Sequence, residues 1–236
     1  MKKVVIYLLF LLPLAASAQF ENLKVSFILG PNLSWMGSND SKVTSDGANL
    51  GFKMHVLGEY LLNDRYSFTG GLGLSFLQGG KLSFAQGGNL WSEAELGIPK
   101  KDSLSNGVVL GYRVNYAEIP FGFKMRTDPF GKWRFYANVP EFSIGLKSRA
   151  RGSIDKNINN STKENISKEI AFLNISWAAG IGTEYSLSDN LAIIAGIRYF
   201  QSITDITDDS GRYFDGSKED SKGTIYNIDF RIGVLF

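Results

Sequence analysis

Apolar and polar residues alternate along most of this chain, and the alternation is clearest in residues 224–236. Large apolar side chains occupy every second position of this stretch: Tyr226, Ile228, Phe230, Ile232, Val234 and Phe236. Polar residues and one glycine occupy the positions between them: Asn227, Asp229, Arg231 and Gly233. A repeat of two residues is typical of a β-strand that has one apolar and one polar face. The stretch is therefore predicted to be a strand.

The same alternation predicts further strands along the chain. In chain order, eight strands are expected at residues 22–36, 50–62, 66–76, 111–126, 132–147, 171–185, 193–199 and 224–236. Tight turns are expected at Asn63, Asp128 and Asp189, whereas the other connections are long. Long and short connections that alternate in this way are typical of outer-membrane barrels. We therefore predict an all-β protein, an eight-stranded antiparallel transmembrane β-barrel with four long extracellular loops.

One face of the predicted strands is apolar, and the other carries glycine and charge. In the second strand, Lys53, His55 and Glu59 share the polar face. In this register His55 falls opposite Gly73 of the next strand. A soluble barrel would turn its apolar face inward, whereas a membrane barrel turns that face to lipid. Glycine and charge suit a narrow lumen, so the membrane barrel is favoured over a lipocalin-like barrel or a β-sandwich.

The fourth and fifth predicted strands change phase midway, at residues 117–120 and 139–142. Each slip contains a proline, which a β-bulge tolerates because the bulge already interrupts the hydrogen-bonded ladder. We predict two bulges that face each other, with position 118 opposite position 140.

These bulges have consequences for the side chains around them. Tyr112, Val114 and Tyr116 precede the first slip and are expected to face outward. Glu118 and Glu141 are expected to meet, as an acid and base pair or within a structural network. Four cations are also expected to point inward: Arg113, Lys124, Arg134 and Arg198. Buried carboxylates beside arginines usually form such networks.

Two of the long loops carry opposite charge. Residues 147–170 hold six basic and three acidic residues, and residues 204–222 hold six acidic and three basic ones. We expect these loops to attract each other at the barrel mouth, although exposed pairs contribute only about 0–1 kcal/mol each. In a third loop, 79–110, Ser92 to Glu95 has the spacing of a helix capping box, which predicts one helical turn near Trp91.

The beginning of the chain has the features of a secretory signal peptide. Lys2 and Lys3 precede an apolar run, 4–16, and small residues follow up to Ala18. The run is too short for a membrane-spanning helix, which needs about 20 apolar residues. We expect cleavage after Ala18, so that residues 1–18 are the signal peptide and residues 19–236 are the barrel domain.

Composition excludes several classes of function. The two lysines of the expected signal peptide account for the formal net charge of +2, so residues 19–236 are formally neutral. A neutral chain lacks the basic surface that nucleic-acid binding requires. The absence of cysteine excludes disulfides and thiolate metal sites.

Residues 115–124, Asn-Tyr-Ala-Glu-Ile-Pro-Phe-Gly-Phe-Lys, resemble the Tyr-Leu-Glu-Ile-Pro-Leu-Leu-Leu-Lys strand of PorT-like outer-membrane barrels of Bacteroidetes-type bacteria. Ala117 stands where that pattern has leucine. Further similarities lie at 196–199, at 202–206 and in the aromatic Phe236. The resemblance implies an eight-stranded barrel, and one branch of the family is an accessory of a system that secretes proteins across the outer membrane. It also implies that Phe236 is the signal read by the barrel assembly machinery.

On the predicted phases, a set of charged residues points into the barrel: Lys53, Glu59, Arg113, Glu118, Glu141, Glu184, Arg198, Asp229 and Arg231. Eight strands enclose a space that side chains can fill. A charge left there without a partner would cost about 3–5 kcal/mol. We therefore expect the acids and bases to interlock and to leave no stable channel.

His55 is the only histidine in the sequence. A hydrolase triad would need it beside a serine and a carboxylate, and Ser75 and Glu59 share its face, but packing is the commoner role for such residues. The acidic residues from Asp205 to Asp215 depart from the pattern of an EF-hand loop, so a solvated loop is expected there rather than a calcium site. We expect no enzymatic activity, no metal and no cofactor.

The sequence favours an outer-membrane β-barrel with a structural or interaction role, in the service of protein secretion or envelope assembly. The expected partners are outer-membrane lipid, the barrel assembly machinery and a protein bound through the extracellular loops, and no nucleic acid. A small-solute pore and a membrane-embedded lipid-modifying enzyme are the alternatives. A pore predicts single-channel conductance, and an enzyme predicts a loss of activity when His55 is changed.

Overall fold

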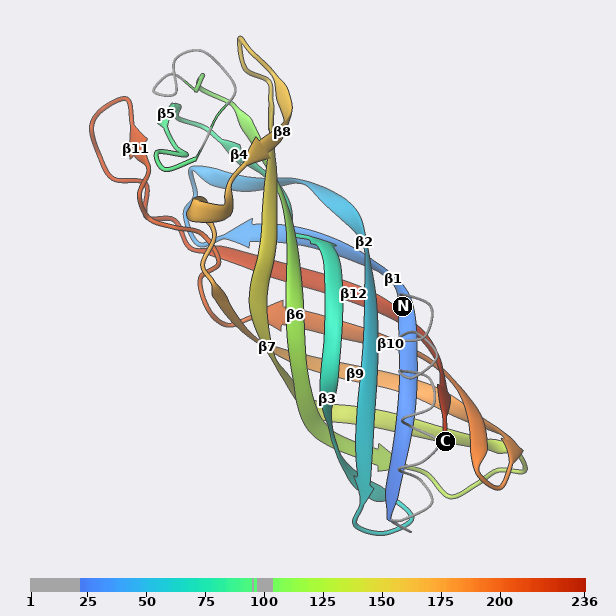
Figure 1. The fold of residues 1–236 in the computed structure, drawn as a ribbon. Helices are drawn as coiled ribbons and strands as arrows, with labels where there is room; N and C mark the ends of the chain where they lie inside the picture. Colours follow the sequence, from blue (N-terminus) through green and yellow to red (C-terminus); the bar gives the residue numbers. More distant parts are fainter. Residues whose placement is uncertain (1–21, 95, 97–103) are drawn as a thin grey trace, which may run out of the picture.

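Eight long antiparallel strands form a closed ring in the computed structural model, which describes residues 22–94, 96 and 104–236 (Figure 1). In ring order they are β1 (Leu23–Ser38), β2 (Val43–Leu61), β3 (Tyr66–Gln78), β6 (Val109–Arg126), β7 (Trp133–Asp155), β9 (Leu173–Ser188), β10 (Leu191–Ser202) and β12 (Gly223–Leu235). β12 pairs with β1, so the ring is closed and the predicted barrel is confirmed. The predicted signal peptide, 1–18, and Gln19 after it lie outside the described residues.

Shorter elements lie in the long connections: β4 (Gly80–Phe84), β5 (Gly88–Asn89), β8 (Ser161–Asn165), the 3-10 turn η1 (Ser167–Glu169) and β11 (Arg212–Tyr213). β4 pairs with β2 and β6, while β8 pairs with the end of β7. These shorter elements, together with the ends of β2, β6 and β7 that pair with them, form a folded unit that we call the cap (Figure 1). The opposite end of the barrel, which carries the tight turns, is the turn end.

The cap corrects two expectations about the long connections. The predicted loop 79–110 contains β4, β5 and the start of β6. Residues 91–94 form bends instead of the predicted helical turn, and Glu95, the last residue of the proposed capping box, lies outside the described residues.

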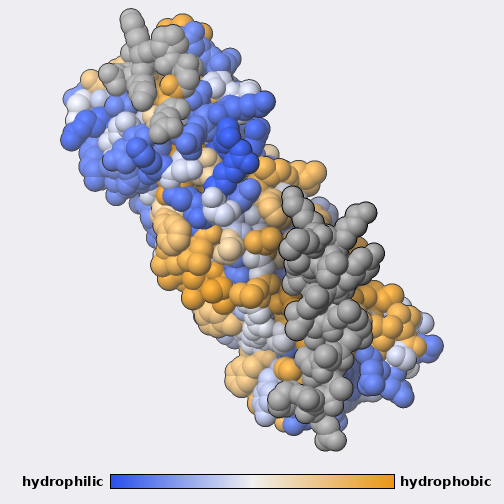
Figure 2. Space-filling model, viewed as in Figure 1, coloured by the Kyte–Doolittle hydropathy of each residue, from blue (hydrophilic) through white to orange (hydrophobic). Residues whose placement is uncertain are grey.

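Large apolar side chains cover the outside of the ring, as the alternation predicts. Val56 is 48% exposed, whereas Lys53 and Glu59 on the same strand are 3% and 1% exposed. Figure 2 shows the resulting hydrophobic band between two hydrophilic ends. An apolar outside around a charged inside is the reverse of a soluble barrel and is suited to lipid. Within the described part of the chain, no helix is long and apolar enough to cross a membrane.

The predicted pairing of β2 with β3 is also confirmed, because His55 lies opposite Gly73. A Cβ atom at position 73 would overlap the His55 ring and lie 2.9 Å from the carbonyl oxygen of Met54. Glycine at this position therefore gives the imidazole the room that it occupies.

β6 departs from its predicted phase. Tyr112, Val114 and Tyr116 were expected outside but are at most 3% exposed and share the inner face with Glu118. Arg113 was expected in the lumen but is exposed on the outside. The prediction fails because the interior is apolar at this height, so that the inward residues are apolar as well.

The two predicted bulges have different outcomes. The slip in β7 is confirmed, because its pairing with β9 shifts register between Asn138 and Glu141. The facing slip in β6 is wrong, since Glu118 pairs with Gly145 and not with position 140. Glu118 and Glu141 are therefore not partners across the two strands.

A hydrophobic core fills the barrel interior at the cap end. Its buried side chains come from the ring and from the cap, among them Met36, Leu82, Phe84, Leu90, Trp91, Leu104, Leu110, Tyr112, Val114, Ile154, Ile166, Ile206, Tyr213 and Ile225. The indole Nε1 of Trp91 donates a hydrogen bond of 3.2 Å to the Tyr112 hydroxyl. The long connections are thus folded around a core of their own, which is stabilised by burial of apolar surface.

Candidate functional site

The lumen between the cap and the turn end contains buried charges in two clusters. The lower tier, nearest the turn end, joins Lys124 and Arg126 of β6 to Glu59 of β2 and Glu184 of β9. Lys124 Nζ lies 2.6 Å from an oxygen of each carboxylate. Arg126 Nε lies 3.0 Å from Glu184 Oε2, and its Nη2 pairs with Glu59. These side chains are at most 6% exposed.

The upper tier, nearer the cap, is centred on Arg198 of β10. Its Nη2 lies 2.6 Å from Asp229 Oδ2 of β12, and its Nη1 pairs with Glu141 of β7. Arg231 Nη1 lies 3.4 Å from Glu141 Oε2. The side chain of Arg198 is 0% exposed. The guanidinium group is therefore enclosed by carboxylates from two other strands.

Lys53 and His55 of β2 complete the upper tier. Lys53 Nζ lies 3.5 Å from Glu118 Oε1 and 3.6 Å from Asp229 Oδ2. It also lies 4.0 Å from the centre of the Phe200 ring. His55 Nε2 lies 2.9 Å from Glu118 Oε2.

The charges of each tier balance. The lower tier sets two cations against two carboxylates. The upper tier sets Lys53, Arg198 and Arg231 against Glu118, Glu141 and Asp229. Charges are tolerated at such burial only when they are paired. The balanced lumen therefore offers no row of one charge that would draw ions through it.

The structure brings together most of the residues expected in this network. Eight of the nine lie in the two tiers, and Arg113 is the exception because it lies on the outer face. Lys124 was expected to point inward but was not counted in this set, and Arg126 was missed, although both share the inward phase of Glu118. That spacing along β6 is the signal that would have found Arg126.

A layer of amides separates the upper tier from the cap core. Asn32 Nδ2 donates hydrogen bonds of 2.9 Å to Gln78 Oε1 and 3.1 Å to Asn227 Oδ1. Ser34 Oγ accepts one of 2.8 Å from the Gly79 backbone. From the turn end to the cap, the lower tier, the upper tier, the amide layer and the cap core follow one another along the barrel axis.

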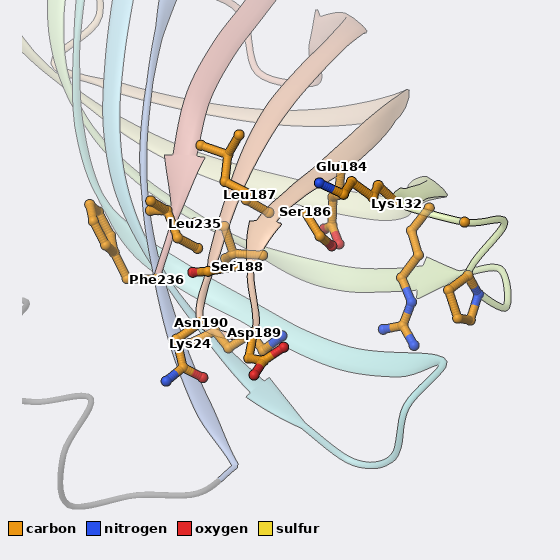
Figure 3. Close-up of a pocket in the computed structure, with 15 residues that line it drawn as sticks. Lys24, Lys132, Glu184, Ser186, Leu187, Ser188, Asp189, Asn190, Leu235 and Phe236 are labelled. Carbon is orange, nitrogen blue, oxygen red and sulfur yellow. The ribbon is translucent and has the colours of Figure 1, made fainter.

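A cavity of about 460 Å³ opens at the turn end (Figure 3). Its lining joins Lys132 and Asp189 of the turns to Glu184 of the lower tier. The cavity is a vestibule that ends at the charge network, because Glu184 belongs to both. A second cavity, beside His55 and Arg198, has about 10 Å³, which is roughly room for one water molecule.

The residues considered for a hydrolase triad are not brought together. His55 contacts Glu118, whereas Glu59 is held by the cations of the lower tier. Ser75 is buried opposite Lys53. Within the described residues, no group of three or more His, Cys, Asp or Glu side chains is arranged to hold a metal ion.

Glu169 joins three segments of the cap. Its Oε1 accepts a hydrogen bond of 2.6 Å from the Glu93 backbone, and its Oε2 accepts one of 3.2 Å from Ser210 Oγ. Its carbonyl oxygen accepts one of 2.9 Å from the Asp208 backbone. Burial raises the pKa of the Glu169 carboxyl above its ordinary value, and these side-chain hydrogen bonds oppose that rise.

The two oppositely charged loops, 147–170 and 204–222, therefore do meet. The contacts that the structure describes between them are hydrogen bonds and not the expected ion pairs. The ion pairs that the structure describes in the cap run elsewhere, from Lys156 to Asp46 and from Lys81 to Asp155, each at 2.9 Å. Backbone hydrogen bonds join the two loops instead, such as the one from the Asp208 N–H to the carbonyl oxygen of Glu169.

Phe236 lies at the seam where the ring closes. Its backbone N–H donates a hydrogen bond of 2.8 Å to the Val25 carbonyl oxygen, and its own carbonyl oxygen accepts one of 3.1 Å from Val25. Its expected role as an assembly signal stays a prediction.

Residues 15–208 match the model of a protein family described as outer membrane protein β-barrel domain. The chain belongs to this family. The protein is therefore located in the outer membrane, where its apolar band is in contact with lipid. Barrels of this kind turn short turns to the periplasm and long loops to the exterior, which places the cap outside the cell. No curated protein matches the chain significantly.

Several solved structures share features of the outer-membrane barrel. Neisserial surface protein A has 14% identity and a TM-score of 0.47, with 91% of this chain and 96% of that chain covered. The attachment invasion locus protein Ail of Yersinia pestis has 13% identity and a TM-score of 0.38, covering 90% and 98%. The outer membrane protease OmpT of Escherichia coli has 8% identity and a TM-score of 0.43, covering 92% and 96%.

Proposed function

We propose that this outer-membrane barrel is a closed, non-enzymatic scaffold that presents its cap to a protein partner, in the service of protein secretion or envelope assembly. The lumen carries this proposal, because its paired charges fill the path that a solute or a substrate would need. The resemblance of residues 115–124 to PorT-like barrels supports the role in secretion.

The cap supports a binding role because it is organised before any partner arrives. Its hydrophobic core and the contacts of Glu169 hold the long connections in one arrangement, which lowers the entropic cost of binding. Ile158 and Phe214 are 88% and 57% exposed on this cap. Apolar side chains in such positions gain free energy when a protein surface covers them.

Photo-cross-linking on intact cells tests this proposal. A photoreactive phenylalanine analogue at position 158 or 214 is expected to cross-link the same protein, because both positions lie on the cap. Phe130 is a matched control, since it is 81% exposed but lies at the turn end. If positions 158, 214 and 130 give the same products, or the cap positions give none, the cap is not the partner's binding surface.

Single-channel recording tests the closed lumen separately. The purified protein in planar bilayers is expected to show no steady conductance, because each charge of the two tiers has a partner of opposite charge across the lumen. A steady ion conductance would replace the scaffold with the small-solute pore.

A further inference from the structure

Three arginines gather on the outer face of the wall where β6 and β7 leave the apolar band. Arg113 pairs with Arg151 across the two strands, and Arg149 lies one row nearer the band. All three side chains are exposed, as is that of Lys163 on the adjoining β8. We call Arg113, Arg149 and Arg151 the arginine patch.

The arginine patch lies directly above the apolar band. Ala117 pairs with Leu146, which in turn pairs with Leu173, a residue that is 42% exposed. The next row toward the cap pairs Asn115 with Arg149. At about 3.3 Å per residue, this row begins within about 7 Å of the apolar one. Figure 2 shows the hydrophobic band giving way to the hydrophilic cap, and lipid head groups lie at such a boundary.

Among the residues that the structure describes, no carboxylate neutralises this patch. Two other cations of the cap each have a carboxylate partner, in the pairs of Lys81 with Asp155 and of Lys156 with Asp46. In the part of the chain that the structure describes, the patch forms no ion pair, and Arg151 donates only a hydrogen bond of 3.3 Å to the Lys163 carbonyl oxygen. Like charges directly opposite each other on neighbouring strands destabilise a sheet. An external anion between Arg113 and Arg151 would remove this repulsion.

We propose that the arginine patch binds the phosphate groups of an anionic lipid in the outer leaflet. Guanidinium groups bind phosphate through two parallel hydrogen bonds, and basic clusters beside a membrane bind anionic head groups. The apolar wall directly below favours a lipid over a free anion, because it accepts acyl chains while the arginines hold the head group. The proposal is independent of the partner that the cap binds.

Lipid titration of the refolded protein in neutral detergent, followed by native mass spectrometry, tests the patch. The probes are lipid A with its phosphates, the same lipid after dephosphorylation, and inorganic phosphate. The triple variant R113Q/R149Q/R151Q is expected to bind lipid A about a hundredfold more weakly than the wild type, at about fivefold per arginine. R113K/R149K/R151K keeps the charge but loses the paired hydrogen bonds, so an intermediate affinity is expected.

The control variant K132Q/R212Q/K218Q removes the same charge from exposed positions away from the boundary and is expected to bind like the wild type. The single variant R149Q, with an expected fivefold loss, keeps the test decisive if the triple variant does not refold. Equal losses in the control and triple variants would overturn the proposal. Equal binding of dephosphorylated lipid, or displacement of lipid A by millimolar inorganic phosphate, would do so as well.

Discussion

Arg198 shows how one side chain can hold several strands together. It belongs to β10 and pairs with Glu141 of β7 and with Asp229 of β12. Because its side chain is 0% exposed, solvent cannot replace a lost partner. Removing the arginine leaves two buried carboxylates short of a cation, and breaking a buried pair in this way costs about 3–5 kcal/mol.

Arg198→Met is therefore expected to lower the free energy of unfolding by about 3–5 kcal/mol. The measurement is the temperature at which the barrel loses its compact gel mobility. Arg231→Met should have a smaller effect, because its pairing with Glu141 is longer, at 3.4 Å. Lys156→Met is the control, since its pair with Asp46 is exposed and contributes little. If Arg198→Met melts like the wild type, water reaches the upper tier.

At the scale of the strands, a period of two reveals two faces but not the medium that each face meets. In β2, polar residues face inward and apolar residues face outward throughout the barrel, because Lys53 lies in a charged lumen and Val56 lies in the apolar band. In β6 it fails above Glu118, because the inward Tyr112 and Val114 enter the hydrophobic core of the cap. A change of environment along one strand therefore shifts the phase of its apolar residues, and in the sequence this shift looks the same as a bulge.

Gly73 provides a test of the pairing between β2 and β3. In Gly73→Ala the new Cβ would overlap the His55 ring, which would have to move away from Glu118. We expect a loss of about 1–3 kcal/mol in the free energy of unfolding, partly recovered when His55→Ala is added. Gly70→Ala on the same strand is the control, because its nearest neighbour, the Pro120 carbonyl oxygen, would be 4.0 Å away. Equal melting of Gly73→Ala and Gly70→Ala would contradict this packing.

At the scale of the whole molecule, the cap should respond to pH. Burial raises the pKa of the Glu169 and Glu219 carboxyls. A carboxyl with a higher pKa in the folded state binds its proton more tightly there. Its contribution to stability is complete below the unfolded pKa of about 4.3 and is lost as the pH rises through the folded pKa. We therefore expect the cap to resist urea better at pH 4 than at pH 7.

Fluorescence of Trp91 follows this unfolding in a variant whose other tryptophans are replaced by phenylalanine. Glu169→Gln is expected to weaken the pH dependence, because glutamine does not ionise. Asp215, whose pKa is lowered to about 2 chiefly by hydrogen bonds from Ser217, titrates below this window. A urea midpoint that rises from pH 4 to pH 7 would contradict the prediction.

The sequence predicts the ring and most of the lumen because inward charges of a narrow barrel can only meet one another. It does not predict the cap, whose core joins Trp91, Ile166 and Ile206 from separate connections without any long alternation. The arginine patch was also hidden, since Arg113 was assigned to the lumen on the phase inferred from its apolar neighbours.

The upper tier has a consequence for how the barrel folds. It takes Lys53 from β2, Glu118 from β6, Glu141 from β7, Arg198 from β10 and Asp229 from β12. In a partly paired sheet these strands are apart and the charges face lipid. Each exposed charge then costs about 3 kcal/mol of free energy. Intermediates are therefore penalised until β1 joins β12. Closure should accordingly be cooperative, because the charges of the upper tier complete their pairing only in the last step of insertion.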